Sequence, residues 1–328
     1  MNRVLKGIDN FMKQKSYRIG IDLGGTNIKA GIVDDDQQLI ATASNPTKAD
    51  RPWQEIVADM AETVRQAAAK ADISVEACRS VGIGNPGVID SENGIIVYSN
   101  NISWKNIPLA QEFRKHIDLP VHVSNDANCA AMGEVVAGAA RGCKNVILLT
   151  LGTGVGGGII INGQVYEGGI GGAELGHATL IAGGKLCTCG RRGCIESYCS
   201  ATALIREADE ALAKHPDSMM AAMKVQAGGM NGKIPFDAAQ SGDETAGAVV
   251  SQYIEWLAEA VTNYVNIFRP EVVLLSGGVC AQGENLTKPL NEYIRKFAFG
   301  GAQTVNTTVK IAQLGNNAGI IGAANFWK

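Results

Sequence analysis

The sequence lacks any long hydrophobic run: nowhere do apolar residues approach the roughly 18 in succession that a membrane helix needs. It also lacks a strong excess of charge. There are 29 lysines and arginines against 32 aspartates and glutamates, and the net charge of −3 gives no reason to expect nucleic acid or an anionic membrane as a partner. Residues 1–16 have neither the apolar core nor the small-residue cleavage site of a signal peptide. These absences predict a cytoplasmic protein.

Glycine, in contrast, is abundant. Forty of the 328 residues are glycine, about 12% against a usual share of about 7%. The glycines gather beside apolar runs instead of forming a repeat, which indicates turns that approach a ligand closely. The chain is also longer than one hydrophobic core usually supports, so we expect two domains.

Hydrophobic periodicity predicts alternating strands and helices, and therefore an α/β fold. Three short strands joined by tight turns are expected between Tyr17 and Ser44. After the turn "NPG" we expect an irregular stretch up to Trp104, and the segment 195–268 should be mostly helical. Further helices are predicted over 51–71, 107–116, from 125 onward, 284–297 and 316–327.

Two blocks of the chain, 128 positions apart, share one pattern. Ile19–Asp34 and Ile147–Asn162 both read as strand, glycine turn and strand in the same register. This weak internal repeat indicates two related halves. Only the first turn carries an acid, because Thr150 stands in the second block where Asp22 stands in the first.

The second glycine turn, "GTGVGG" at 152–157, matches the spacing of a dinucleotide-binding loop, and Glu174 follows about where a ribose-binding acid would. That loop must lead into a helix, whereas the residues after it are typical of a strand, so we reject a dinucleotide site. The bare N–H groups of two hairpin turns facing each other suit a polyphosphate. Asp22 beside such a turn suits Mg²⁺, held mainly through its waters. The alternative is two ordinary hairpin turns.

One histidine and three cysteines lie close together in the sequence: His177, Cys187, Cys189 and Cys194. These are the ligand types of a closed tetrahedral zinc site, which has a structural and not a catalytic role. The alternatives are reduced surface thiols or a redox Cys-x-Cys pair. Cys199 is not expected to be a ligand. Without a secretion signal, the other cysteines are expected to be buried thiols: Cys78, Cys129, Cys143 and Cys280.

The stretch "SNDAN" places Asp126 in the first turn of a helix, directly after a strand. A helix N-terminus favours an ionised carboxylate, and such a group can accept a hydroxyl proton during phosphoryl transfer. The alternative is a simple helix cap by Asn125 or Asp126. Other polar residues near element ends could bind a polyhydroxyl substrate: Asn101, Asn125, Glu174, His177 and Glu196.

Taken together, these motifs resemble the ROK family of bacterial sugar kinases and repressors, and are closest to its glucokinases. The resemblance begins at Tyr17 and rests on "DLGGTNIKAGIVD", "GNPG", "NNISW", "NDANCAAMGE", "LGTGVGGGI", "GAELGH", "CTCGRRGCIES" and "LLSGGV". It implies a two-domain actin/hexokinase-like fold, a duplicated ribonuclease H-like α/β fold with an interdomain cleft. The implied domains are residues 1–123 plus 316–328 and residues 124–315. The resemblance also implies a homodimer.

The resemblance further assigns roles to matching positions. Asp126 corresponds to the base that deprotonates the sugar 6-hydroxyl, and Asp22 lies near Mg²⁺. The positions that bind ATP include Asp22, Gly24, Gly25, Thr26, Gly152, Thr153, Gly154, Gly277 and Gly278. The positions that contact the sugar are Gly87, Asn101, Asn125, Asp126, Glu174, His177 and Glu196. The zinc ligands are His177, Cys187, Cys189 and Cys194, with His177 also reaching the sugar. Asn100 stands where many members carry proline.

The implied activity is ATP-dependent phosphorylation of glucose at its 6-hydroxyl to give glucose 6-phosphate. Kinases for N-acetylglucosamine, N-acetylmannosamine, allose or fructose are alternatives within the family. Its repressors carry a winged helix-turn-helix before the first phosphate loop, and the 21 residues before Asp22 are too few for one, so a repressor is not expected. A third alternative is a protein that binds ATP and sugar without turnover.

Overall fold

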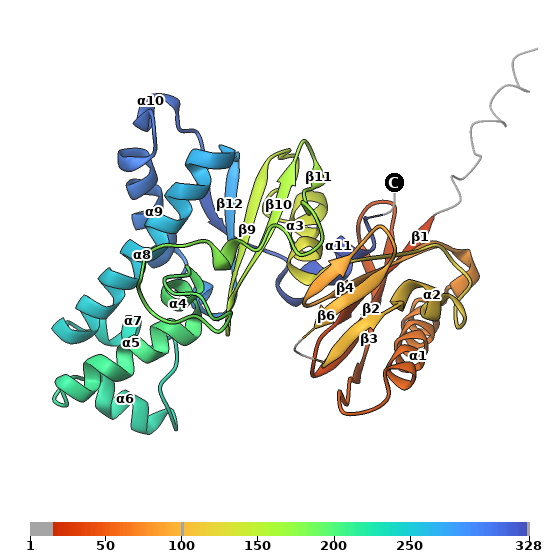
Figure 1. Ribbon diagram of the computed structural model, residues 1–328, viewed down its shortest axis with the longest axis horizontal. Coiled ribbons are helices and arrows are strands. Elements are labelled where there is room, and N and C mark those ends of the chain that lie inside the picture. The colour runs from red at the N-terminus through yellow and green to blue at the C-terminus, as the bar shows by residue number, and fades with distance from the viewer. Residues whose placement is uncertain (1–15, 100–101, 327–328) are drawn as a thin grey trace, which may run out of the picture.

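The computed structural model describes residues 16–99 and 102–326 (Figure 1). Two five-stranded sheets organise the molecule. The first has the order β3-β2-β1-β4-β8. Its strands are β1 (Tyr17–Leu23), β2 (Asn27–Asp34), β3 (Leu39–Pro46), β4 (Cys78–Asn85) and β8 (Val121–Asn125). The second sheet has the order β11-β10-β9-β12-β13. Its strands are β9 (Val146–Leu151), β10 (Val155–Ile161), β11 (Gln164–Val165), β12 (Val272–Ser276) and β13 (Thr308–Ile311).

The two sheets have the same topology. In each, the first three strands in sequence form an antiparallel meander, and two later strands add in parallel beside the first. β1 and β2 therefore correspond to β9 and β10, as the internal repeat predicts. Both glycine turns connect antiparallel strands, and β10 follows the second turn where a dinucleotide-binding loop would need a helix.

Helices cover both faces of each sheet, as Figure 1 shows. Helices α1 and α2 pack on the outer face of the first sheet, and α8 and α9 pack on the outer face of the second. Between the sheets lie α11, against the first, and α3, against the second. Their bounds are α1 (Trp53–Ala71), α2 (Leu109–Arg114), α3 (Asp126–Ala137), α8 (Glu244–Phe268), α9 (Glu284–Phe297) and α11 (Ala318–Ala323).

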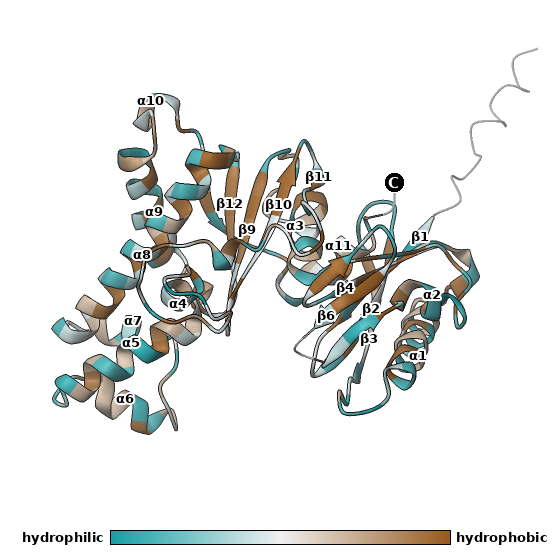
Figure 2. Cartoon of the chain, viewed as in Figure 1, coloured by the Kyte–Doolittle hydropathy of each residue, from teal (hydrophilic) through white to brown (hydrophobic). Residues whose placement is uncertain are grey.

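The remaining helices belong to the half that contains the second sheet. They are α4 (Glu196–Cys199), α5 (Ala201–Lys214), α6 (Met220–Gln226), α7 (Ile234–Gln240) and α10 (Gly301–Thr304), with 3₁₀ turns at Val75–Ala77, Leu175–His177, Gly278–Gln282 and Gly315–Asn317. In Figure 2 the strands are mostly hydrophobic, whereas α1, α5 and α6 carry residues of both kinds. The predicted apolar face of α1 is buried, including Ile56, Met60 and Val64. Within residues 16–99 and 102–326, no helix has both the length and the hydropathy that crossing a membrane requires.

The prediction of an irregular stretch before Trp104 is wrong. That region forms a three-stranded antiparallel sheet of β5 (Val88–Asp90), β6 (Ile95–Ser99) and β7 (Trp104–Ile107). The turn between β5 and β6 carries Asn93 and Gly94, which are typical turn residues, and the Asn93 backbone N–H donates to Asp90 Oδ1. The final helix, α11, is shorter than predicted at both ends: the 3₁₀ turn Gly315–Asn317 occupies its first residues, and the helix ends at Ala323.

The cysteines are largely where they were predicted. All eight are free thiols, and Cys78, Cys129 and Cys280 are buried. Cys143 is only partly buried, so its prediction as a core thiol is not met; it lies in the turn between α3 and β9. Cys199 is buried on α4, as expected for a cysteine that is not a metal ligand.

The backbone of α11 lies in direct contact with the backbones of α3 and of the first sheet. A Cβ atom added to Gly322 of α11 would lie 1.6 Å from the carbonyl oxygen of Cys129 in α3. A Cβ atom on Gly20 of β1 would lie 1.9 Å from the carbonyl oxygen of Ile320. Since even a methyl group does not fit, only glycine permits this packing.

We predict that Gly322→Ala lowers the free energy of unfolding by about 2 kcal/mol or more, because the new methyl group overpacks the α3–α11 contact. Gly247→Ala is the matched control: it also replaces a helical glycine, but no atom lies within 4 Å of the added Cβ. The control should be neutral or stabilising by up to about 1 kcal/mol. Urea titrations compare the two variants, and similar midpoints would contradict this account of the contact.

Candidate active site

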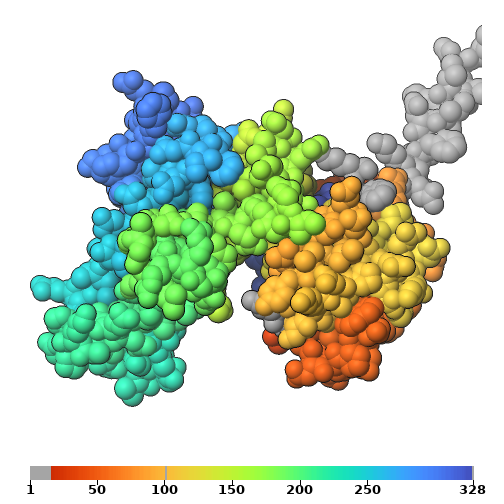
Figure 3. All heavy atoms as spheres, viewed as in Figure 1, coloured from red at the N-terminus to blue at the C-terminus, as the bar shows by residue number. Residues whose placement is uncertain are grey.

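A groove separates the two halves of the molecule, and Figure 3 shows it from one side. A cavity of about 490 Å³ lies here, walled by both halves. Its lining includes most of the predicted sugar-contacting residues and one of the predicted ATP-binding residues, Gly154: Gly87, Asn125, Asp126, Gly154, Glu174, His177 and Glu196. Residues more than 100 positions apart in the sequence thus line the same cavity. Asn101 lies outside the described residues.

Strand geometry explains how the first half contributes. β1, β4 and β8 run parallel, so their carboxyl ends meet at one edge of the sheet. Register places Asp22 beside Gly84, and Asn85 beside Asn125. α3 begins directly after β8, which puts Asp126 in its first turn at this same edge.

Asn125 is the N-cap of α3. Its Oδ1 accepts a hydrogen bond from the Ala127 backbone N–H at 2.9 Å, and its Nδ2 donates to the carbonyl oxygen of Gly87 at 3.2 Å. The Asp126 carboxylate also accepts from the Ala127 N–H at 2.9 Å. The capping alternative for Asn125 is therefore correct, and it leaves Asp126 at the cavity wall.

Burial raises the pKa of Asp126 to about 6, and the nearby carboxylates of Asp22 and Glu174 add to the shift while backbone N–H groups oppose it. The expectation that the helix N-terminus keeps this acid ionised therefore underestimates desolvation. A carboxyl group whose pKa lies near neutrality is well matched to accept a proton from an alcohol.

Burial also raises the pKa values of two nearby acids, Asp22 and Glu174. Burial raises the pKa of Asp22, and Lys29, whose Nζ lies 3.9 Å from Asp22 Oδ2, opposes the shift. Burial also raises the pKa of Glu174, with His177 opposing and Glu196 reinforcing. Three carboxyl groups with raised pKa values in one region form a site that favours a cation or a neutralising ligand.

Glu196 connects the cavity to the second glycine turn. Its Oε2 accepts from the Val155 backbone N–H at 3.1 Å, and its Oε1 accepts from Thr188 Oγ1 at 2.9 Å. A Cβ atom on Gly154 would lie 2.3 Å from Glu196 Oε2, so the absence of a side chain there lets the carboxylate approach the turn.

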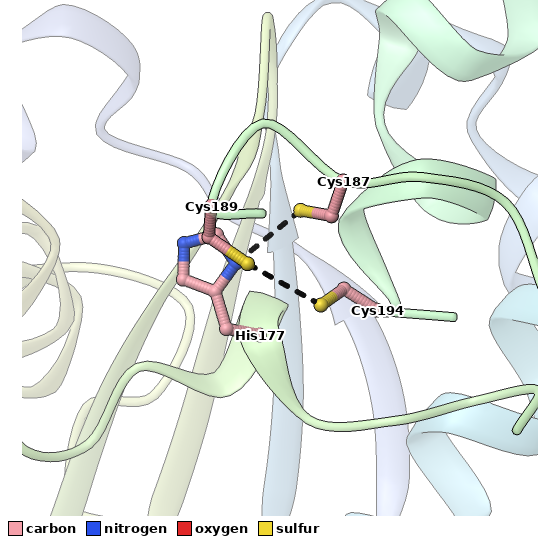
Figure 4. Close-up of side chains that lie close together, drawn as sticks. All are labelled: His177, Cys187, Cys189 and Cys194. Carbon is pink, nitrogen blue, oxygen red and sulfur yellow. Dashed lines mark hydrogen bonds between the residues drawn. The ribbon is translucent and has the colours of Figure 1, made fainter. Parts of the chain in front are cut away.

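The histidine and the three cysteines meet as predicted. One ligand atom from each of His177, Cys187, Cys189 and Cys194 lies within 4.8 Å of all the others (Figure 4). His177 Nδ1 is 3.6 Å from Cys187 Sγ, and the sulfurs of Cys189 and Cys194 are 3.7 Å apart. Around a tetrahedral zinc ion, bonds of about 2.0 Å to nitrogen and about 2.3 Å to sulfur place a nitrogen and a sulfur ligand roughly 3.6 Å apart and two sulfur ligands roughly 3.8 Å apart. The donor set and its spacing therefore fit zinc.

The predicted nucleotide-binding residues lie outside the cavity lining, except Gly154. Asp22 lies at the end of β1, where a Cβ atom on Gly319 of α11 would be 3.5 Å from its Cγ. A Cβ atom on Gly277 would lie 2.2 Å from the carbonyl oxygen of Leu151, so the loop after β12 packs on the end of β9. The others are Gly24, Gly25, Thr26, Gly152, Thr153 and Gly278.

Sequence reasoning missed several lining residues. Thr150, the counterpart of Asp22, lines the cavity and accepts a hydrogen bond from the Gly156 N–H at 3.1 Å. Asn128 lines it as well, one helical turn after Asn125, a spacing that could have indicated it. Tyr98 and Glu167 also line it, and no motif pointed to either.

Comparison with known proteins identifies the family. The ROK family matches residues 18–328. The chain belongs to the ROK family. Its residues are 37% identical over 313 positions to a glucokinase of Thermotoga maritima, covering 94% of this chain and 96% of that protein. The predicted resemblance and the two-domain actin/hexokinase-like fold are thereby confirmed.

Solved ROK-family structures extend the comparison. A ROK glucokinase from Streptomyces griseus, in complex with glucose and AMPPNP, has a TM-score of 0.77 and 34% identity, over 94% of this chain and 98% of that one. A ROK transcriptional regulator, a homologue of E. coli MLC, has a TM-score of 0.81 and 25% identity, over 94% of this chain and 77% of that one. The family therefore includes both kinases and regulators.

Asp126→Asn tests the burial of this acid through stability. The folded chain keeps the Asp126 proton up to a pKa of about 6, whereas the unfolded chain releases it near the ordinary value of 3.8. The folded state thus binds more protons between these values, and Asp126 makes stability fall as pH rises through this window. Asparagine does not titrate, so the variant should gain up to about 3 kcal/mol over wild type at pH 8 and little at pH 3.

Asp243→Asn provides a control of opposite sign. Hydrogen bonds from the Ala246 and Met219 N–H groups and from Ser218 outweigh the effect of burial and lower the pKa of Asp243. Its substitution should therefore lose stability above the ordinary carboxyl pKa. Urea unfolding from pH 3 to pH 8 measures both, and parallel curves for Asp126→Asn and wild type would contradict the raised pKa.

Proposed function

We propose that this ROK-family chain is a hexokinase-type phosphotransferase that transfers the γ-phosphoryl group of ATP to the 6-hydroxyl of glucose. One observation carries the proposal: Asp126, with a pKa raised to about 6, lines one cavity with the second glycine turn and with polar groups suited to sugar hydroxyls. The Thermotoga maritima and Streptomyces griseus relatives bear the name glucokinase, and the latter was solved with glucose and AMPPNP.

In the proposed reaction Asp126 accepts the proton of the 6-hydroxyl. The sugar oxygen attacks the γ-phosphorus, the bond from that phosphorus to the β-phosphate oxygen breaks, and ADP leaves. Asn125, Glu174, His177 and Glu196 bind the other hydroxyls together with Asn101, and the backbone at Gly87 completes the wall. These groups hold the sugar so that only one hydroxyl faces Asp126.

ATP would lie on the two glycine turns. The turns 24–26 and 152–154 follow β1 and β9, and their backbone N–H groups would bind phosphate oxygens, except those of Gly24 and Gly152, which donate to the Asn27 and Gly154 carbonyl oxygens within the turns. Gly277, whose loop packs on the end of β9, would lie beside the nucleoside together with Gly278. Asp22 would hold Mg²⁺ through water, and a bound Mg²⁺ supplies the positive charge that this acid-rich region favours. Lys29 adds one further positive charge beside Asp22.

We propose zinc at the cluster of His177, Cys187, Cys189 and Cys194. A site with four protein ligands has no open position, so zinc would be structural. His177 would bind the metal through Nδ1 and present Nε2 to the cavity that it lines. Zinc would also fix the loop that places Thr188 on Glu196, which joins the metal site to the sugar pocket.

The two lobes would act as domains of residues 1–123 plus 316–328 and residues 124–315. Closure of the groove on glucose would exclude water as the acceptor. A homodimer and a cytoplasmic location stay predictions from the resemblance and the sequence.

Related kinases of other hexoses or N-acetylhexosamines are the second candidate function, and the similarity to a ROK regulator makes a sugar-responsive regulator the third.

A phosphorylation assay across hexoses and N-acetylhexosamines tests the function. With ADP release coupled to an indicator reaction, glucose should show the highest kcat/KM. Asp126→Asn should reduce kcat at least about a hundredfold, since the general base is lost, while calorimetry still detects glucose binding. If kcat/KM for an N-acetylhexosamine exceeds that for glucose tenfold, the assignment moves to that sugar. A tenfold ratio corresponds to a difference of about 1.4 kcal/mol in free energy. Binding of ATP and glucose without turnover would favour a regulator.

Cys189→Ser tests the metal site. Losing one thiolate of four should reduce bound zinc from about one ion per chain to a small fraction and lower the melting temperature. Cys143→Ser is the control, because Cys143 is a partly exposed thiol outside the cluster. Elemental analysis of the purified proteins measures the zinc content. Equal zinc in both variants and wild type would remove the cluster as the metal site.

A further inference from the structure

Glu167 makes a contact across the groove that the proposed chemistry leaves unused. It follows β11, in the half that contains the second sheet. Its Oε1 accepts a hydrogen bond from Ser91 Oγ at 3.0 Å and another from Ser124 Oγ, and Asn128 Nδ2 lies 3.5 Å away. Ser91 lies in the turn after β5, and Ser124 lies in β8, so a single carboxylate joins the second-sheet half to two elements of the other half.

The segment that Glu167 begins forms one wall of the cavity. Residues 167–174 read "EGGIGGAE", and Gly169, Gly171, Gly172, Ala173 and Glu174 all line the cavity. Four glycines in eight residues give a backbone with high conformational freedom. Gly171 has φ +72°, and a Cβ atom there would lie 3.2 Å from Val88, so the loop also packs against β5.

The loop is ordered at both ends. At one end, the backbone N–H of His177 donates to the carbonyl oxygen of Glu174 at 3.1 Å, which begins the 3₁₀ turn that leads to the metal cluster. At the other end, the Glu167 carboxylate holds the loop against the opposite half. Since Ser124 lies two residues before Asp126, its hydrogen bond to Glu167 also holds the loop close to the start of α3.

We propose that Glu167 is a positioning residue that fixes the glycine-rich wall 168–173, and through it Glu174, against the sugar. The inference rests on the proposed function for its substrate. A carboxylate that accepts two or three hydrogen bonds holds a loop more firmly than a neutral acceptor does, because bonds to a charged group are about twice as strong. Glu167 itself does not take part in phosphoryl transfer.

Steady-state kinetics with Glu167→Ala test the proposal. The KM for glucose should rise about tenfold, as expected for losing hydrogen bonds to a charged group. The kcat should stay within about threefold and the KM for ATP should not change, because in the proposed function the loop contacts the sugar and not the reacting phosphate. Glu167→Gln should recover part of the loss, since its amide oxygen still accepts. Glu92→Ala, which removes an exposed carboxylate one residue from Ser91, is the control and should match wild type.

A double-mutant cycle separates positioning from general stability. Ser91→Ala should raise the KM for glucose severalfold in wild type and add little in the Glu167→Ala background. Additive effects, or a lowered melting temperature with an unchanged KM, would overturn the proposal.

Hydrogen exchange gives a readout that does not need activity. Amides of 168–175 should exchange faster in Glu167→Ala than in wild type or Glu92→Ala. If wild type phosphorylates no sugar, the proposed function fails by itself. Unchanged exchange in this segment would then still refute the role of Glu167, and faster exchange would support it.

Discussion

The close contact between α3 and α11 is the constraint on which the site depends. These two short helices fill the space between the sheets, and their backbones approach so closely that Gly322 and Gly133 cannot carry a side chain. α11 packs equally closely on β1 through Gly20 and on β4 through Gly82. The end of β1, which carries Asp22, and the start of α3, which carries Asp126, are therefore held near each other. Burial is the main cause of the raised pKa of Asp126, and the Asp22 carboxylate that this packing brings near adds to the shift.

Sequence patterns predicted the elements that are determined by interactions between residues close together in the chain. The meander, the two glycine hairpins, the start of α3 and the α9 bounds all follow from strand alternation, turn residues and helix caps, and the structure confirms them. The meeting of His177, Cys187, Cys189 and Cys194 was predictable because the four side chains lie within one short segment. The prediction failed at β5 to β7, because strands of three to five residues are too short for alternation to reveal, although Asn93 and Gly94 are typical turn residues. Glu167 carried no signal because its role exists only where the two halves meet.

The sign of the shift at Asp126 shows the same limit. A helix N-terminus lowers the pKa of a nearby carboxyl group, and the sequence displays that helix start clearly. Burial is larger, and it was invisible in the sequence because it is produced by the cavity walls from both halves. A carboxyl group balanced in this way can lose its proton near neutral pH and still attract one from an alcohol. The burial that raises its pKa is thus also the property that would suit it to the proposed role of base.

Two glutamates hold the walls of the cavity together. Glu196 links the loop of the histidine–cysteine cluster, through Thr188, to the Val155 N–H of the second glycine hairpin. Glu167 links the glycine-rich wall to the opposite half, through Ser91 and Ser124. Glu174 lies between these contacts on a segment that has few apolar side chains of its own. Because such a segment cannot be ordered by hydrophobic packing, its position must come from polar contacts at its two ends. A wall built in this way would let the cavity change shape in the proposed closure without disturbing either hydrophobic core.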